Sequence, residues 1–380
     1  MLGLLIVKKR NSYQQVRKKM KIAICVYDLY NGGAERVASL WANGFVKRGD
    51  EVCLVACAKD PRMSYPLNPD IKVFNIWSEG KSGIRFFRKI LNLRRIMRQN
   101  RPNIALAVLN PFDLILPLST VGLGITCINT EHNSFERPDS IPMTAGVRFR
   151  KFHLNKLFKA ITVLTQSDKK VIANHLRKVF VLPNPVTFES LDAIPEKKKV
   201  VLAAGRLDNW YVKGFDVLID AWGKIQRNHP DWELQIAGRG KKEDEQFLKE
   251  RAISNGIQDG FRLLGYCDNI EEKYKSSAIF AFPSRCDGFG MVLTEAMSRG
   301  CACVSCDYNG RQAEIITNEN EGILVPTDDV DVFADSLDRL MSDQKLLETL
   351  QNGALRRAKD FSIDGIVDQW YNIFKELGVV

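Results

Sequence analysis

Short apolar runs rich in β-branched residues alternate along the chain with longer segments whose apolar positions recur every three or four residues. The short runs predict buried strands, and the longer segments predict amphipathic helices. In the first half we expect strands at 22–27, 51–56, 72–76, 104–109, 126–129, 160–164 and 179–182, with helices at 34–47, 84–98, 146–158 and 167–176. In the second half we expect strands at 200–204, 233–237, 261–264, 278–282, 302–305 and 322–325, with helices at 215–228, 242–254, 292–299, 330–342, 344–359 and 363–377.

This alternation predicts an α/β fold of two Rossmann-like domains, each with a doubly wound parallel sheet. Right-handed crossovers place the carboxyl ends of a domain's strands along one edge, where ligands bind, so the two edges should face each other across a cleft. Prolines at 183 and 185 interrupt the pattern, so we expect the domains at 20–183 and 184–362. Residues 1–19 would form a basic tail outside both domains, and 363–380 a last helix for which the N-terminal domain is a candidate packing surface.

The composition is that of an ordinary globular protein. The 380 residues suit two hydrophobic cores, and 45% of them are apolar. No apolar run reaches the roughly 18–20 residues that span a bilayer. The apolar run at 1–7 precedes its basic cluster, which is the reverse of a secretion signal. We therefore expect a cytoplasmic chain whose nine cysteines stay reduced.

The charge is unevenly distributed between the predicted domains. Residues 21–183 carry 25 Lys/Arg against 12 Asp/Glu, whereas 184–380 carry 24 against 33. A basic first half indicates an anionic partner, with nucleic acid, anionic lipid and a phosphorylated acceptor as candidates. The chain lacks a nucleic-acid motif that combines aromatic and basic residues, which argues against nucleic acid. A solvated surface is the plain alternative.

Gly32 and Gly33 follow the first predicted strand and open the first helix. Backbone amides at a helix N-terminus suit a phosphate, and glycine leaves room for the phosphate to approach. The dinucleotide fingerprint G-x-G-x-x-G is absent, so a tight turn without a ligand is an equal alternative.

Arg206 and Lys213 stand between a predicted strand end and the next helix, at the edge where ligands bind. Arginine offers a planar fork to phosphate, and lysine offers a mobile point charge. Two solvated cations are the alternative to a phosphate site.

The strongest signal is the segment 283–296, where the loop Gly288-Phe289-Gly290 joins a predicted strand to a helix. A diphosphate placed there would receive amide hydrogen bonds and the field of the helix dipole, worth about 0.3–1 kcal/mol for a charge. Asp287 in the loop and Glu295 on the helix suit different hydroxyls of one ligand. An ordinary acidic helix start would explain the two acids, but not why this loop and the two cations all follow strand ends.

Six short motifs occur together in one known family of enzymes. In this chain they are Gly205-Arg206 with Lys213-Gly214, Ala237-Gly238-Arg239-Gly240, Leu263-Leu264-Gly265-Tyr266, Asp287-x7-Glu295, Asn31-Gly32-Gly33-Ala34-Glu35 and Thr130-Glu131-His132-Asn133. Through them, residues 200–330 resemble the donor domain of the family-4 retaining glycosyltransferases, which have the GT-B fold. The first half resembles the acceptor domain of that family, and the likeness covers nearly the whole chain from residue 20.

This resemblance implies a UDP-sugar donor and a reaction that uses no metal and no cofactor. Arg206 and Lys213 would bind the donor diphosphate, and His132 would lie beside the transferred sugar. Asp287 would contact the sugar hydroxyls; it stands where the family usually has Glu, which indicates a different or shifted sugar. Glu295 would bind the ribose hydroxyls. The other implied donor-binding positions are Gly33, Gly240, Tyr266, Gly288, Phe289, Gly290, Met291 and Val292.

The acceptor prediction rests on the helix expected at 84–98. Its apolar face is Phe86, Ile90, Leu93 and Met97, flanked by Phe87 and Ile96, and its cationic arc is Arg85, Arg88, Lys89, Arg95 and Arg98. A cationic amphipathic helix suits anionic lipid head groups or a pyrophosphate, and a solvated helix face is the alternative. The segment is similar to family members that add N-acetylgalactosamine to undecaprenyl-diphosphate-linked glycans, in which a basic helix grips the pyrophosphate. The resemblance implies acceptor binding by Gly32, Arg85, Arg88, Lys89 and Arg95.

We therefore expect a retaining glycosyltransferase that moves a hexose or N-acetylhexosamine (Gal, GalNAc, Glc or GlcNAc) from a UDP-sugar to a lipid-linked glycan. Undecaprenyl diphosphate is the expected carrier, in bacterial surface polysaccharide synthesis at the inner face of the cytoplasmic membrane. The alternatives are a sugar-nucleotide epimerase of the same architecture and a nucleic-acid binder. Asp329-Val330-Asp331 has the form of a metal-binding Asp-x-Asp motif, but its place before a helix indicates N-terminal helix charge.

Overall fold

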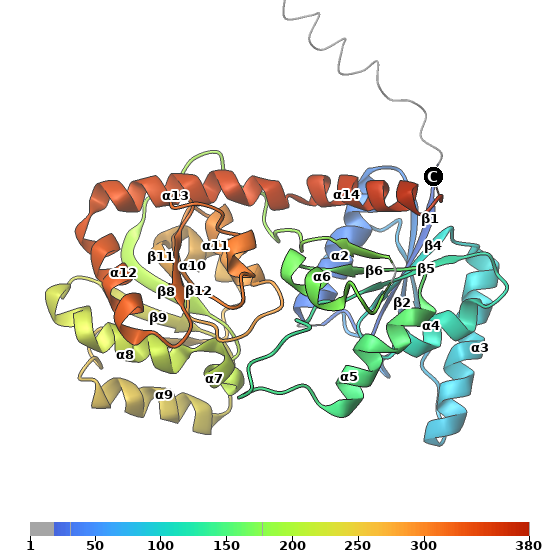
Figure 1. Ribbon diagram of the computed structural model, residues 1–380, viewed down its shortest axis with the longest axis horizontal. Coiled ribbons are helices and arrows are strands. Elements are labelled where there is room, and N and C mark those ends of the chain that lie inside the picture. Colours follow the sequence, from blue (N-terminus) through green and yellow to red (C-terminus); the bar gives the residue numbers. More distant parts are fainter. Residues whose placement is uncertain (1–18, 31, 177, 380) are drawn as a thin grey trace, which may run out of the picture.

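The computed structural model describes residues 19–30, 32–176 and 178–379, which form two α/β lobes side by side (Figure 1). Residues 1–18 of the expected basic tail lie outside the described residues, as does Asn31 of the first glycine motif. Each lobe has its own parallel sheet covered by helices, so the predicted fold class is confirmed.

The N-terminal lobe is built on a seven-stranded sheet in the order β3-β2-β1-β4-β5-β6-β7, and each neighbouring pair of strands is parallel. Its strands are β1 (Lys21–Val26), β2 (Glu51–Ala56), β3 (Lys72–Asn75), β4 (Ile104–Val108), β5 (Thr126–Thr130), β6 (Ala160–Val163) and β7 (Val179–Val181). Its helices are α2 (Gly33–Lys47), α3 (Ser82–Asn100), α4 (Phe112–Thr120), α5 (Ala145–Phe152), the 3-10 turn η1 (Leu154–Leu157) and α6 (Gln166–Ile172).

The C-terminal lobe has a six-stranded sheet in the Rossmann order β10-β9-β8-β11-β12-β13. Its strands are β8 (Lys198–Ala204), β9 (Glu233–Ala237), β10 (Phe261–Gly265), β11 (Ser277–Phe282), β12 (Ala302–Asp307) and β13 (Ile323–Pro326). Its helices are α7 (Trp210–Lys213), α8 (Phe215–Ile225), α9 (Lys242–Ser254), α10 (Ile270–Ser276), α11 (Met291–Ser298), α12 (Val330–Ser342) and α13 (Gln344–Ala358). The last helix of the chain is α14 (Ile363–Glu376).

The predicted elements differ from the observed ones mainly among the helices. The helix expected at 146–158 is wrong in its second half, because α5 ends at Phe152 and a separate 3-10 turn follows. The helices α4 and α10 were not predicted. Pro117 lies inside α4. A proline usually indicates the end of a helix, but this helix continues to Thr120. At the predicted Asp-x-Asp motif, the side chain of Asp329 accepts a hydrogen bond from the Val332 amide and caps α12.

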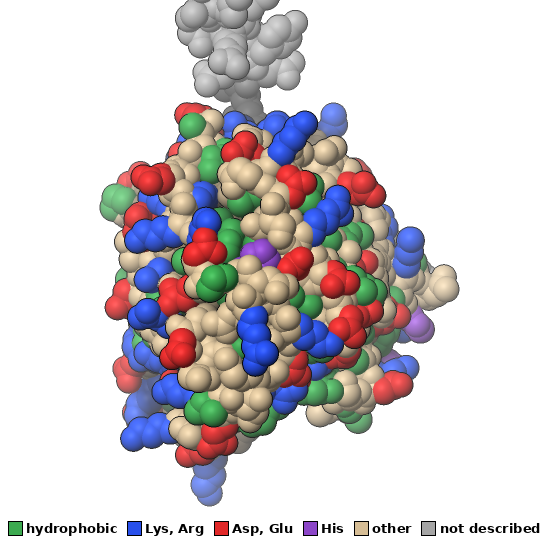
Figure 2. Space-filling view, turned by 90° about the vertical axis from the view of Figure 1, so that its left-hand side faces the viewer, with side chains coloured by type: hydrophobic (Ala, Val, Ile, Leu, Met, Phe, Trp, Pro, Cys, Tyr) green, Lys and Arg blue, Asp and Glu red, His purple; other side chains and the backbone are tan. Residues whose placement is uncertain are grey.

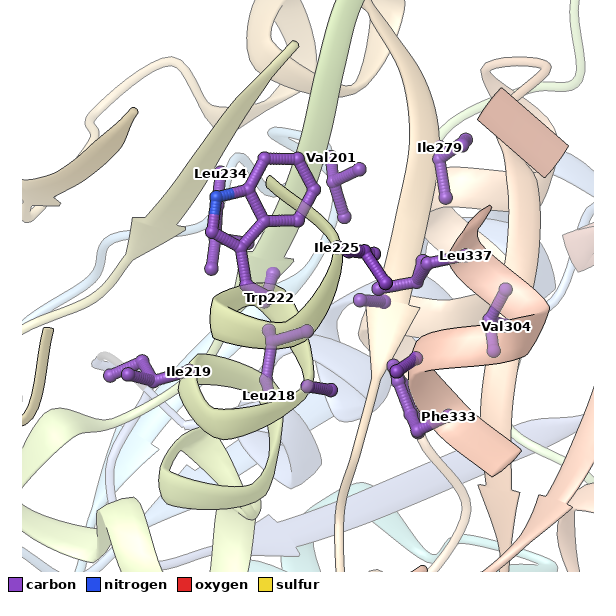
Figure 3. Packing of buried hydrophobic residues seen from close by; sticks show 14 of the residues in the cluster. Val201, Leu218, Ile219, Trp222, Ile225, Leu234, Ile279, Val304, Phe333 and Leu337 are labelled. Atoms are coloured by element: carbon purple, nitrogen blue, oxygen red, sulfur yellow. The ribbon is translucent and has the colours of Figure 1, made fainter. Parts of the chain in front are cut away.

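One hydrophobic core of the C-terminal lobe lies between its sheet and two adjacent helices, α8 and α12 (Figure 3), and a second lies around α11 and α13. Trp222 and Leu218 of α8 and Phe333 and Leu337 of α12 are fully buried against the sheet. Burying each such side chain is worth about 1.5–3 kcal/mol. This packing holds the strands in place. The candidate active site described below lies at their carboxyl ends.

The chain crosses between the lobes twice, first between β7 and β8 and again between α13 and α14. Figure 1 shows α13 lying on the C-terminal lobe and α14 on the N-terminal lobe. There Trp370 of α14 meets Trp41 of α2 edge to face, with ring centroids 5.1 Å apart. The two crossings are joined by a hydrogen bond of 2.8 Å from the Val186 amide to the Phe361 carbonyl. Within the described residues, no helix has the length and apolar character needed to cross a membrane.

Candidate active site

A pocket of about 630 Å³ opens at the carboxyl ends of β8, β9 and β10. The loops after these strands form most of its wall, together with Val292 and Glu295 of α11. Arg36 and Tyr65 line it from the N-terminal lobe, so both lobes contribute. The pocket lies at the switch point of the sheet, where the strand order reverses between β8 and β11 and where α/β sheets bind ligands.

Lys213 and Asp287, which were predicted to contact the donor diphosphate and the sugar, meet beside this pocket. Lys213 ends the short helix α7, and its Nζ donates a hydrogen bond of 2.5 Å to the Oδ2 of Asp287, in the loop after β11. Each side chain is 20% exposed. The pair is therefore protected enough to hold its geometry and open enough for a ligand to reach.

Arg285 connects the two segments that hold Lys213 and Asp287, and none of the sequence motifs indicated this role. Its guanidinium donates two hydrogen bonds of 2.8 Å to the two carboxylate oxygens of Asp216. Its backbone amide donates to the carbonyl of Val212, next to Lys213. Bidentate pairs of this kind fix direction as well as distance, so Arg285 ties the Asp287 loop to the Lys213 loop. The only available signal was a cation inside the segment 283–296.

The predicted glycine loop forms the start of α11. Gly290, at a φ of 93°, is the N-cap residue, and no described side chain caps the helix. Its first-turn amides therefore keep the donor capacity of an uncapped helix start. Phe289 is 3% exposed and packs edge to face on Phe361, at 5.6 Å between centroids, which anchors the loop. The arrangement suits an anion in front of Met291 and Val292.

Glu295 lies at the wall of the pocket but is 3% exposed and held by three donors. Its Oε1 accepts from Arg36 Nη1 at 2.9 Å and from the Thr187 hydroxyl at 2.5 Å, and its Oε2 accepts from the Tyr274 hydroxyl at 3.2 Å. Arg36 comes from α2, so this ion pair crosses between the lobes. No local sequence pattern singles out Arg36, because its partner lies 259 residues away.

Arg206 and Tyr266 both line the pocket, with different surroundings. The Arg206 side chain is 75% exposed and donates through Nε and Nη2 to the two oxygens of Asp208, at 3.0 and 2.7 Å. It does not contact the Lys213–Asp287 pair. Tyr266 is 53% exposed, and the Arg239 guanidinium lies 4.9 Å from its ring centroid, which gives the pocket an aromatic wall. Gly240 lies in the same wall.

His132 lies two residues after β5, at the edge facing the C-terminal lobe. Its Nε2 is 3.1 Å from the Thr130 hydroxyl, and its ring packs on Trp41 at 5.6 Å between centroids. Burial lowers the pKa of His132 to about 4, although the nearby Glu131 charge opposes this effect. The imidazole is therefore neutral at pH 7 and acts as a hydrogen-bond partner, not as a cation.

The lobes approach each other at this histidine. A Cβ added to Gly288 would lie 2.3 Å from the His132 carbonyl oxygen, so only glycine permits the contact. A Cβ on Gly33 would lie 3.5 Å from the Met291 sulfur. Gly33 and His132 of the N-terminal lobe thus stand opposite the Gly288–Met291 loop of the C-terminal lobe.

The predicted acceptor-binding cations lie on α3, away from the pocket at β8 to β10. Arg85 and Lys89 lie over the Trp77 ring, at 5.6 and 5.0 Å from its centroid, and Lys89 also donates to the Cys57 carbonyl at 3.3 Å. Arg88 donates to the Glu79 carbonyl at 3.0 Å. Arg95 is exposed. Gly32 caps α2, and its carbonyl accepts from the Tyr65 hydroxyl at 3.1 Å.

One residue of the α3 prediction is wrong. Phe87 was placed beside the apolar face, but it is 67% exposed, because the helix is rotated so that Leu93, Ile96 and Met97 are the buried residues. Ile84 and Leu91 are exposed with it. The outer side of α3 is therefore apolar as well as cationic.

Two sequence profiles match adjoining parts of the chain. One, described as glycosyltransferase family 4, matches residues 31–190, and the other, described as glycosyl transferases group 1, matches 189–357. The chain is a family-4 glycosyltransferase of the GT-B fold. Among the described residues of this glycosyltransferase, no group of three His, Cys, Asp or Glu side chains is placed to hold a metal ion.

Two named relatives of this glycosyltransferase match over nearly their whole length. An α-1,4-N-acetyl-D-galactosaminyltransferase of Campylobacter jejuni, whose name gives a diNAcBac-PP-undecaprenol glycan as acceptor, is 26% identical over 94% of this chain and 99% of its own. The amylovoran biosynthesis glycosyltransferase AmsD of Erwinia amylovora is 27% identical over 93% of this chain and 99% of its own. A glycosyltransferase structure from Rickettsia africae has the same fold, with a TM-score of 0.78 at 18% identity over 95% of this chain and 99% of that one.

Proposed function

We propose that this glycosyltransferase moves a hexose or N-acetylhexosamine from a UDP-sugar to a glycan carried on a lipid diphosphate, with retention of the anomeric configuration. The observation that carries the proposal is the Lys213–Asp287 pair in front of the uncapped start of α11, next to the pocket of about 630 Å³. In this arrangement the base and ribose would occupy the pocket, and the diphosphate would lie between Lys213 and the α11 amides.

The chemistry requires little more than charge stabilisation. The bond between the sugar C1 and the phosphate oxygen breaks with its electron pair on the oxygen, while the acceptor hydroxyl oxygen bonds to C1 on the same face. The hydroxyl proton passes to the departing phosphate oxygen. Lys213 and the amides of Met291 and Val292 stabilise the charge that develops on the phosphate. Asp287, once Lys213 turns to the phosphate, accepts hydrogen bonds from sugar hydroxyls.

Several predicted roles extend this proposal. Tyr266 would border the base, Glu295 would bind the ribose hydroxyls, and the neutral His132 would hydrogen-bond the transferred sugar. Arg206 would reach the diphosphate only by leaving Asp208, which its exposed position permits. No metal is needed in this scheme, and transfer should persist in the presence of a chelator.

The acceptor part of the proposal rests on α3 and on the named relatives. The name of the Campylobacter jejuni relative gives an undecaprenol-linked glycan as its acceptor, and that of the Erwinia amylovora relative gives amylovoran biosynthesis as its role. We infer a polyprenyl-diphosphate glycan of surface polysaccharide assembly for this chain, with Arg85, Arg88, Lys89 and Arg95 near the anionic head group. The membrane contact would then lie on the N-terminal lobe. The outer face of the C-terminal lobe instead shows acidic and basic side chains interspersed (Figure 2).

The test is a panel of nucleotide sugars, incubated with purified protein and a polyprenyl-diphosphate glycan, with nucleotide release as the readout. We expect release with one UDP-sugar, and loss of that release in Asp287→Ala, Lys213→Ala and Glu295→Ala. Wild-type activity in all three variants would contradict the proposal. Conversion of the donor to its epimer without an acceptor would favour the epimerase instead.

A further inference from the structure

The pocket at β8 to β10 receives a cation from the opposite lobe, Arg36 of α2. Its side chain is 29% exposed, and its Nη1 lies 2.9 Å from the Oε1 of Glu295, which is 3% exposed. On the other side, the guanidinium lies 5.0 Å from the ring centroid of Tyr65. The Tyr65 hydroxyl in turn donates to the Gly32 carbonyl at 3.1 Å. Arg36 is therefore held between its own lobe and a carboxylate of the other lobe, in the wall of the pocket.

The Glu295 carboxylate has one hydrogen-bond position left among its described contacts. A carboxylate accepts about four hydrogen bonds, two at each oxygen. Oε1 accepts from Arg36 at 2.9 Å and from the Thr187 hydroxyl at 2.5 Å, which uses both of its positions. Oε2 accepts from the Tyr274 hydroxyl at 3.2 Å. The remaining position, on Oε2, can take a hydroxyl of a ligand in the pocket that Glu295 lines.

The groups around Glu295 keep their protons, so they act as donors. Tyr274 is 1% exposed, and burial together with the Glu295 charge raises the pKa of its hydroxyl well above the ordinary value. Burial opposes the charge of Arg36, but the Glu295 carboxylate and Tyr65 outweigh it and raise the pKa of Arg36. The carboxylate is thus surrounded by one cation and two neutral hydroxyls, and the charge-assisted hydrogen bond from Arg36 is the strongest of the three.

The orientation of Glu295 depends on the opposite lobe for this reason. Among the described residues, Arg36 is the one cation within ion-pair distance of Glu295. A buried carboxylate that loses its cation is left with an uncompensated charge, which favours its turning toward water or taking a proton. Either change would remove the free acceptor position on Oε2 from its present place.

From these contacts we propose that Arg36 is a positioning residue for nucleotide recognition, which holds the Glu295 carboxylate toward the ribose hydroxyls of the donor from the opposite lobe. The inference rests on the proposed function, because that function places the ribose in this pocket. It adds that full discrimination of the ribose requires the two lobes to be in contact.

The test compares the dissociation constants of UDP and 2′,3′-dideoxy-UDP, measured by titration calorimetry on the full chain. The two nucleotides share the base and the diphosphate, so the ratio of their dissociation constants isolates the two ribose hydroxyls. The variants are Arg36→Met, Glu295→Gln and the two combined. The matched control is Arg48→Met, which breaks the pair of Arg48 with Asp368 just after the same helix, outside the pocket.

We expect UDP to bind at least about tenfold more tightly than the dideoxy nucleotide in the wild type and in Arg48→Met, the effect of hydrogen bonds to a charged group. In Arg36→Met the ratio should fall below about threefold, and the double variant should have the ratio of Glu295→Gln alone, because both changes remove one arrangement. A ratio in Arg36→Met equal to that of the wild type would overturn the inference, even if both nucleotides bound more weakly, because a structural role alone weakens both equally.

Hydrogen–deuterium exchange of the wild type tests the same link without a variant. UDP should slow the exchange of the amides at 34–40, at the start of α2, more than saturating dideoxy-UDP does, since only UDP engages Glu295 and so strengthens its contact with Arg36. Equal protection by the two nucleotides would contradict the inference. A wild type that does not bind UDP would contradict the proposed function, and the inference with it. Binding of UDP with an unchanged ratio in Arg36→Met would contradict the inference alone.

Discussion

At the scale of single residues, the Lys213–Asp287 pair is the centre of the account. Without a ligand the two charges neutralise each other at 2.5 Å, each 20% exposed. In the proposed reaction a diphosphate would offer Lys213 a stronger partner, and the exchange would release Asp287 toward the sugar. Lysine suits such an exchange because its ammonium group is a point charge on a flexible stem.

We predict that Lys213→Ala lowers the rate of nucleotide release by about 10²–10³-fold, the usual effect of removing one group that stabilises transition-state charge. The matched control is Lys224→Ala, which breaks the exposed Lys224–Asp331 pair of the same lobe and should leave the rate unchanged. A rate in Lys213→Ala within threefold of wild type would rule out this role.

His132 gives a prediction for stability against pH. Its pKa of about 4 lies below the ordinary value of 6.5, so between these pH values the unfolded chain binds a proton that the folded chain does not. The free energy of unfolding should therefore fall as the pH drops from 6.5 to 4. His132→Gln removes this contribution, and the slope of its urea midpoint against pH should be shallower than that of the wild type. His153→Gln, at an exposed histidine, should keep the wild-type slope; parallel slopes for His132→Gln and wild type would refute the assignment.

At the scale of elements, α3 presents an unusual outer side. Ile84, Phe87 and Leu91 are 52%, 67% and 64% exposed, and their spacing of three and four residues places them on one stripe. The arginines beside this stripe complete the pattern of a helix that lies in a membrane interface. The opposite side packs on the lobe through Leu93 and Met97.

We predict that Ile84→Ser combined with Phe87→Ser greatly reduces co-sedimentation with phosphatidylglycerol vesicles. The wild type itself should bind phosphatidylcholine vesicles more weakly, because the attraction of the cationic residues to anionic lipid is absent there. Ile253→Ser, at a residue 62% exposed on α9 of the other lobe, is the control and should bind like the wild type. Equal binding by the double variant would contradict a docking role for α3.

The sequence predicts elements well here and contacts poorly. A buried parallel strand reads as a compact apolar run, so each strand end falls within two residues of its expected position. Helix α4 was not predicted because it contains Pro117. Phe87 was assigned to the wrong side of α3 because periodicity alone does not fix how far a helix is rotated about its own axis. The Arg36–Glu295 ion pair depends on how the two lobes meet, which no local pattern encodes.

At the scale of the whole molecule, buried polar contacts hold the two lobes together. Arg311, 0% exposed, forms an ion pair of 2.9 Å with Asp168, 2% exposed, in the other lobe. Beside it, Glu314 accepts from the amides of Gln166 and Ser167 at 2.7 and 3.0 Å. These contacts fix the relative position of the two lobes.

We predict that Arg311→Met lowers the free energy of unfolding by about 3–5 kcal/mol, because it leaves Asp168 buried without its cation. Adding Asp168→Asn should restore part of the loss, since the uncompensated charge is then gone. Urea denaturation measures both effects. A single variant as stable as the wild type would show that the pair does not hold the interface.

The most direct test of the central claim is real-time proton NMR of a UDP-sugar with purified protein and no acceptor. We expect slow hydrolysis in which UDP and free sugar form together, and in which an α-linked donor first yields the α anomer, before mutarotation. Lys213→Ala should abolish both signals. A first product in the β configuration, or epimerised donor without UDP release, would contradict retaining transfer from this site.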